Sequence, residues 1–192
     1  RPDHLGRDSW ELIRLEDGDK VVGAVPLRTG EEELAFVTSE AQLLHFSASL
    51  VRPQGRSGGG VAGIKLGAGA HVVAFGAVSD LESAHVVTVA GSSDALPGTQ
   101  AGSVKVSPLA AYPAKGRGTG GVRCQRLLRD EDALVFAWVG DGAPIASAAS
   151  GSPVDLPEPV EKRDASGTPV AQPIAGVSAS AHDLTVGADV PD

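Results

Sequence analysis

Short apolar runs separated by turn residues dominate the chain, and many of them alternate or are rich in β-branched residues. Runs of about four to eight residues bounded by Gly, Pro, Asp or Ser are typical of β-strands. We find no helical period that persists beyond a turn or two. The pattern predicts an all-β fold, with strands at residues 10–15, 20–27, 33–38, 42–46, 61–66, 71–78, 85–90, 104–106, 133–139 and 144–148.

A glycine-arginine stretch occurs twice and leads each time into an apolar segment. The first copy runs from Gln54 to Leu66, and the second runs from Lys115 to Leu127, 61 residues later. Each unit holds about four short strands, which is typical of propeller blades and their relatives. Because one blade cannot bury both faces of its sheet, neighbouring blades must stack.

The repeats predict a propeller-like array of about three four-stranded blades that forms a partial disc. The third unit decays into a proline-rich segment, and we expect the acidic end of the chain to be disordered. The predicted divisions are a linker with the first strand (1–14), blade one (15–66), blade two (67–127), a degenerate blade three (128–180) and the acidic tail (181–192).

Charge is distributed unevenly along the chain. The net charge of −8 argues at first against a nucleic-acid partner. Residues 42–129, however, carry a net charge of +6, whereas residues 1–41 carry −5 and residues 130–192 carry −9. The cations of the central zone gather around the two glycine stretches, although ordinary surface scatter would also explain them.

Each glycine stretch presents an arginine beside unhindered backbone N–H groups. Together these groups can approach phosphate oxygens closely, and a guanidinium can bind them in a bidentate manner. The alternative is that the glycines serve only tight strand exchange and the arginines are solvated. The candidate DNA-contacting residues are Arg52, Gln54, Arg56, Lys65, Lys105, Lys115, Arg117, Arg123 and Arg126.

Other chemistries find little support in the sequence. A P-loop pattern is missing after both glycine stretches, and the five histidines are not paired at metal-ligand spacing. Cys124 is expected to be a small buried side chain, and the single tyrosine, Tyr112, is not expected to be catalytic. Trp10, Phe136 and Trp138 are expected to anchor the core between blades.

Several motifs together resemble the C-terminal domain of the A subunit of bacterial type IIA topoisomerases, meaning gyrase and topoisomerase IV. The resemblance is nearest to the A subunits of high-GC Gram-positive bacteria and covers most of residues 10–140. The segments that carry it are Leu34–Ser39, Leu43–Phe46, Val51–Arg56, Gly59–Leu66, Tyr112–Arg117 and Gly120–Arg123.

This resemblance implies a β-pinwheel, a disc of four-stranded blades that exchange strands, whose basic rim binds and bends duplex DNA. Gln54–Gly60 occupies the place of the gyrase-A box, a loop needed for DNA wrapping. It keeps Gln54, Arg56 and the glycines, but Gly55 replaces the first basic residue and no lysine separates Gly59 from Gly60. We therefore do not predict strong chiral wrapping or negative supercoiling.

The resemblance also implies a larger parent protein. The chain contains no methionine and begins with arginine, so we expect it to be a piece of a longer chain. The parent enzyme would be a topoisomerase, which is an isomerase, and it would hydrolyse ATP and require Mg²⁺. Its A subunits would form a dimer and would bind the topoisomerase B subunit. This segment would be non-catalytic, with no cofactor of its own. The lone cysteine fits a reducing, cytoplasmic setting near the nucleoid.

A rival interpretation remains a protein-interaction propeller whose acidic ends form the working surface. A weaker third idea is that the acidic tail competes with DNA for the basic rim. No apolar run approaches the roughly 20 residues needed to span a bilayer.

Overall fold

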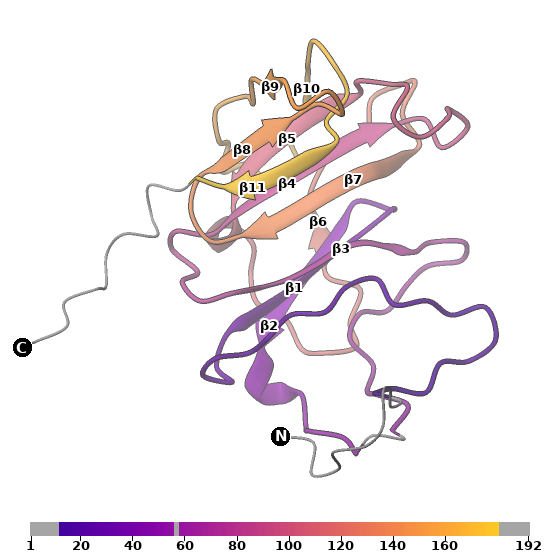
Figure 1. The fold of residues 1–192 in the computed structure, drawn as a ribbon, viewed down its shortest axis with the longest axis vertical. Coiled ribbons are helices and arrows are strands. Elements are labelled where there is room, and N and C mark those ends of the chain that lie inside the picture. Colours follow the sequence, from indigo (N-terminus) through magenta and orange to yellow (C-terminus); the bar gives the residue numbers. More distant parts are fainter. Residues whose placement is uncertain (1–11, 56–57, 181–192) are drawn as a thin grey trace, which may run out of the picture.

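The computed structural model describes residues 12–55 and 58–180, and these residues form three small antiparallel sheets (Figure 1). Two single 3-10 turns, η1 (Ala48–Leu50) and η2 (Leu109–Ala111), follow β2 and β5. The helical segments of the described residues are too short to cross a membrane. The strands are β1 (Glu33–Thr38), β2 (Gln42–Ser47), β3 (Val72–Val78), β4 (His85–Gly91), β5 (Ser103–Pro108), β6 (Val122–Arg123), β7 (Ala133–Gly140), β8 (Pro144–Ser147), β9 (Pro153–Val154), β10 (Thr168–Pro169) and β11 (Gly176–Ala179).

Every sheet combines one hairpin with a strand supplied from further along the chain. The first sheet has the order β3-β1-β2-β6, the second β10-β5-β4-β7 and the third β11-β8-β9. Thus β3 completes the β1–β2 hairpin, β7 completes β4–β5 and β11 completes β8–β9. The predicted all-β array of about three sheets is confirmed, with four strands in two sheets and three in the last. Since β3 and β6 come from residues 67–127, the division into blades by residue range stays a prediction.

Two expected strands are wrong. Residues 20–27 and 61–66 are fully described and form no strand. On the β1 edge of the hairpin, β3 is already paired along the strand, and β6 pairs with Gln42 and Leu43 at the start of β2. Residues 61–66 instead bond residues 118 and 119 through Gly63 O and Lys65 N. A strand was also expected at residues 10–15, but its described residues, 12–15, form no strand. Trp10 and the acidic tail lie outside the described residues.

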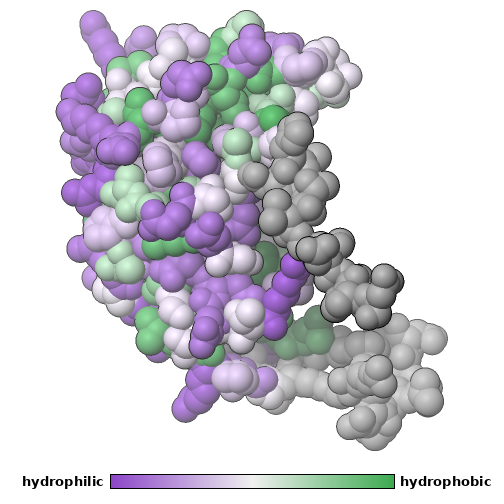
Figure 2. All heavy atoms as spheres, turned by 90° about the vertical axis from the view of Figure 1, so that its left-hand side faces the viewer, coloured by the Kyte–Doolittle hydropathy of each residue, from purple (hydrophilic) through white to green (hydrophobic). Residues whose placement is uncertain are grey.

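A continuous apolar core joins the first and second sheets. Val37 and Leu43 from the first sheet and Val86 and Leu134 from the second belong to one buried cluster. Side chains of this size contribute roughly 1.5–3 kcal/mol each when they leave water. The face of the molecule seen in Figure 2 is largely hydrophilic, with smaller hydrophobic areas between the polar side chains. The core therefore lies between the sheets.

The second and third sheets share a further apolar cluster. Phe136 and Trp138 of β7 pack against buried Val87 and Val106, together with Ile174 from the segment before β11. The expected core role of Phe136 and Trp138 is therefore confirmed.

An aromatic group also lies on the other face of the first sheet, where Phe46 stacks on Phe36 with ring centroids 5.6 Å apart.

Truncating this aromatic group should destabilise the first sheet. Phe46 is 1% exposed, so Phe46→Ala should lower the free energy of unfolding by about 3–5 kcal/mol, through lost burial and the cavity that remains. Leu50→Ala is the control, because Leu50 lies four residues away and is 53% exposed. Urea denaturation of both variants tests this expectation, and equal losses would contradict the packing described.

Candidate nucleic-acid interface

Backbone hydrogen bonds hold the two glycine-rich segments side by side. We call residues 58–66 the first glycine loop and residues 113–121 the second glycine loop. Gly118 N donates to Gly63 O (2.6 Å), and Lys65 N donates to Thr119 O (2.9 Å). One guanidinium N–H of Arg117 donates to Ala62 O (2.7 Å). Two segments that are far apart in sequence therefore form one continuous surface.

Glycine is required at specific points of the second loop. Gly121 has φ +73°, and a Cβ at this position would collide with the carbonyl of Leu43 on β2. Gly118 has φ +80°, a left-handed conformation that side chains disfavour. By contrast, a Cβ at Gly116 would meet nothing within 4 Å. The close approach of the loop to β2 therefore depends on Gly121.

The core of the first sheet anchors the start of the second loop. His45 of β2 is 1% exposed, and its Nε2 donates to Tyr112 O at 2.8 Å. Its Nδ1 lies 2.6 Å from a carboxylate oxygen of Glu33. Lys115 N donates to His45 O at 3.2 Å. Both the ring and the main chain of His45 therefore hold the loop, as expected of a structural histidine.

Most predicted contact residues lie on the surface. Lys65 and Arg123 line one hollow together with Gly120 and Gly121. Arg126 is exposed, and its N–H donates to Ala165 O at 3.1 Å. Arg56, another predicted contact residue, lies outside the described residues. The remaining exposed members of the predicted set are Arg52, Gln54, Lys115 and Arg117.

Lys105 corrects the prediction, because it is buried in the core and is only 1% exposed. Its ammonium donates to Tyr112 Oη (3.0 Å), Cys124 O (2.9 Å) and Arg163 O (2.9 Å). Burial lowers the pKa of Lys105 to about 8 and raises the pKa of the Cys124 thiol to about 12. Lys105 is thus unsuited to touch a phosphate backbone, whereas Cys124 is buried as expected.

Two further cations, Lys162 and Arg163, lie in a charged segment of mixed sign beside this surface, and they were not among the predicted contact residues. Lys162 and Arg163 line a hollow together with Arg123 of β6 and with the acidic residues Glu161 and Asp164. A signal was available, because Arg163 precedes a small Ala-Ser-Gly stretch similar in composition to the glycine loops. The cations therefore continue from Lys65 through Arg123 toward the segment before β10. Acidic side chains lie among them, Glu40 in the first hollow and Glu161 and Asp164 in the second.

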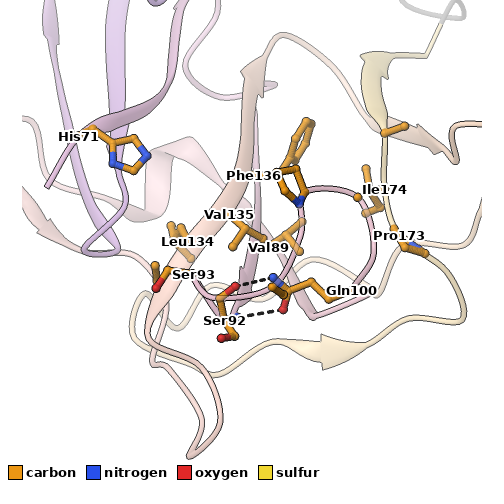
Figure 3. Close-up of a pocket in the computed structure, with 15 residues that line it drawn as sticks. His71, Val89, Ser92, Ser93, Gln100, Leu134, Val135, Phe136, Pro173 and Ile174 are labelled. Carbon is orange, nitrogen blue, oxygen red and sulfur yellow. Dashed lines mark hydrogen bonds between the residues drawn. The ribbon is translucent and has the colours of Figure 1, made fainter. Parts of the chain in front are cut away.

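A separate pocket of about 450 Å³ lies between β7 and the segments around Ser92 and Ile174 (Figure 3). Its lining is mainly apolar and includes Phe136. The Gln100 side chain accepts from Ser92 N (2.8 Å) and donates to Ser92 O (2.7 Å), so both of its polar ends are satisfied within the loop. The described residues contain no cluster of three metal-ligating side chains, here or elsewhere.

The glycine requirement can be tested within the second loop. Gly121→Ala should lower the free energy of unfolding by about 1–3 kcal/mol, because it adds a steric clash to a disfavoured φ. Gly116→Ala should change it by less than about 0.5 kcal/mol, since that site is open. Thermal unfolding of the pair measures the contrast. A Gly121→Ala chain as stable as Gly116→Ala would contradict the close approach to Leu43.

Buried Lys105 predicts an unusual pH dependence. Folded Lys105 loses its proton near pH 8, whereas its ordinary pKa is 10.5, so the unfolded chain binds more protons between these values. The free energy of unfolding should therefore rise between pH 8 and 9, on the order of 0.5–1 kcal/mol. Above about pH 10 it should fall again, because burial raises the pKa of both Cys124 and Tyr112 and their combined losses exceed the remaining gain from Lys105. Urea denaturation at each pH tests this, and a rise that persists in Lys105→Met would rule out Lys105 as its source.

Comparison with known proteins agrees with this geometry. The family model described as DNA gyrase C-terminal domain, beta-propeller, matches residues 11–28, 32–79 and 98–137, which is more than half of the chain. The A subunit of DNA gyrase from Escherichia coli strain K12 is 36% identical over 110 residues, covering 57% of this chain and 11% of that protein. Topoisomerase subunit TopoM of Mycolicibacterium smegmatis is 37% identical over 107 residues, covering 55% of this chain and 14% of that protein.

Solved structures show the same fold. The C-terminal domain of DNA topoisomerase IV aligns with a TM-score of 0.68 and 21% identity, over 87% of this chain and 52% of that chain. A DNA gyrase A C-terminal domain aligns with a TM-score of 0.65 and 18% identity, over 87% of this chain and 56% of that chain. The chain thus spans about half of these domains and a small part of the curated relatives. The chain belongs to the DNA gyrase C-terminal domain family, as the C-terminal domain of a topoisomerase A subunit.

Proposed function

We propose that this domain binds duplex DNA without sequence preference, through the basic surface of the two glycine loops. The observation that carries the proposal is the hydrogen-bonded pairing of these loops, with exposed cations on both. Exposed cationic side chains suit phosphate oxygens, which every DNA sequence presents alike.

The path of the duplex follows from the positions of the cations. Lys65 and Arg123 share one hollow, and Arg123 shares the next hollow with Lys162 and Arg163. The acidic residues of these hollows, Glu40, Glu161 and Asp164, would have to lie away from the phosphates. A duplex laid along this line would contact several phosphates at once. Because the surface continues over more than one sheet, the bound duplex would bend to follow it.

In the parent protein, the domain would guide a DNA segment to the catalytic core. That core would cleave and rejoin DNA with ATP and Mg²⁺, in a complex of A and B subunits in the cytoplasm. The present chain would supply only binding, because its single tyrosine is buried with its hydroxyl bonded to Ser107 (2.7 Å) and Lys105. Such a hydroxyl is unavailable to attack a phosphodiester.

Salt dependence tests the binding mode. If about five phosphates are contacted, the slope of log K against log salt should be roughly −4 to −5. Lys65→Ala with Arg123→Ala should make the slope less negative by about 2 and weaken binding to all duplex sequences equally. Fluorescence anisotropy with a labelled duplex between about 50 and 200 mM salt, the range over which this effect is large, measures both quantities.

The matched control is Arg28→Ala with Arg129→Ala, which removes the same charge from exposed sites outside both loops and both hollows. This control should leave the slope nearly unchanged. Equal effects of the two double variants would show that only net charge matters. No binding at low salt would reject the proposal and favour the protein-interaction alternative.

A further inference from the structure

The buried ammonium of Lys105 lies where the two ends of the second glycine loop meet. Tyr112 immediately precedes the loop, and Cys124 follows β6 at its other end. Lys105 Nζ donates to Tyr112 Oη at 3.0 Å and to Cys124 O at 2.9 Å. One side chain on β5 therefore bridges both ends of the segment that carries Lys115, Arg117 and Arg123.

Further contacts make this junction rigid. Ser107, two residues after Lys105 on β5, has its hydroxyl 2.7 Å from Tyr112 Oη. Cys124 N donates to Ala41 O at 2.8 Å, so the far end of the loop is also fixed to the first hairpin. The third bond of Lys105, to Arg163 O at 2.9 Å, adds the charged segment of Lys162 and Arg163 before β10. The junction thus connects the base of the second loop with this segment.

Among its described residues, the first glycine loop has no equivalent junction. The 3-10 turns η1 and η2 precede the two loops at equivalent places and begin 61 residues apart, at Ala48 and Leu109. At the same offset, Leu44 corresponds to Lys105 and Val51 corresponds to Tyr112. Both are apolar members of the cluster around Phe46. At these positions of the first repeat, apolar packing holds the turn in place. A buried charge is therefore not required to form such a turn.

We propose that Lys105 is a positioning residue for DNA binding, which ties the two ends of the second glycine loop and thereby holds its cations against the first loop. This inference rests on the proposed function. A buried ammonium is costly unless hydrogen bonds compensate it, and here its three protons meet three acceptors. Loss of the ammonium would remove this donor from the buried Cys124 carbonyl and from the partly buried Arg163 carbonyl. The longer bond from Tyr112 Oη to Cys124 O (3.3 Å) would then be the remaining side-chain link between the loop ends among the described contacts, and the ends would separate more readily.

Lys105→Met tests the proposal, since it keeps most of the length of the side chain and removes every donor. Amide hydrogen exchange in residues 113–121 should become about tenfold faster or more in the variant, while the third sheet stays unchanged. The Kd for a short duplex should rise about three- to tenfold, because a mobile loop pays an ordering cost on binding. Tyr112→Phe removes one of the three acceptors and the hydroxyl's own bonds to Ser107 and Cys124 O, but it keeps the ammonium. It should shift both quantities in the same direction by less.

Val154→Ala is the control for general destabilisation, because Val154 is buried in the third sheet, away from the loop. It should leave loop exchange and the Kd unchanged. Unchanged loop exchange in both Lys105→Met and Tyr112→Phe would overturn the proposal, and so would faster exchange with an unchanged Kd. If the unaltered chain does not bind duplex DNA, the proposed function fails and the positioning role fails with it. The exchange measurement would still report whether Lys105 ties the loop, so the two failures are distinguishable.

Discussion

Strand exchange between hairpins is the constraint on which the rest of the structure depends. Each hairpin receives its third strand from further along the chain, so β3 must leave the first repeat region and return to β1. This path fixes the two glycine loops as the connections outside the sheets. Backbone bonds such as Gly118 N to Gly63 O then place the loops next to each other. The basic surface is thus a consequence of topology as well as of composition.

The fold was largely predictable because its signals are local. Short apolar runs between turn residues located β1, β2, β3, β4 and β7 closely. The segments at 20–27 and 61–66 have the same local character, yet they are not strands. Whether such a segment joins a sheet depends on tertiary pairing: β3, from later in the chain, takes the edge at β1, and residues 61–66 bond the second glycine loop. Local propensity carries no information about this competition.

The sequence predicted the glycines and most of the cations of the candidate site. It did not predict the buried residues that hold the loops in place. Lysine is usually exposed, so Lys105 was expected on the rim, whereas it lies in the core. The bond between His45 and Tyr112 O spans 67 residues of sequence and depends on β2 passing beneath the loop. Such polar contacts in the interior depend on tertiary packing, so they cannot be predicted from the spacing of residues in the sequence.

The central claim is that the two paired loops form one surface for DNA. Amide hydrogen exchange of the chain with and without a short duplex tests this claim most directly, because it locates contacts without altering any residue. We predict slower exchange in residues 58–66 and in residues 113–121 together when DNA is bound, with little change in β8 and β11. Protection confined to the third sheet, or to only one of the two loops, would contradict the account.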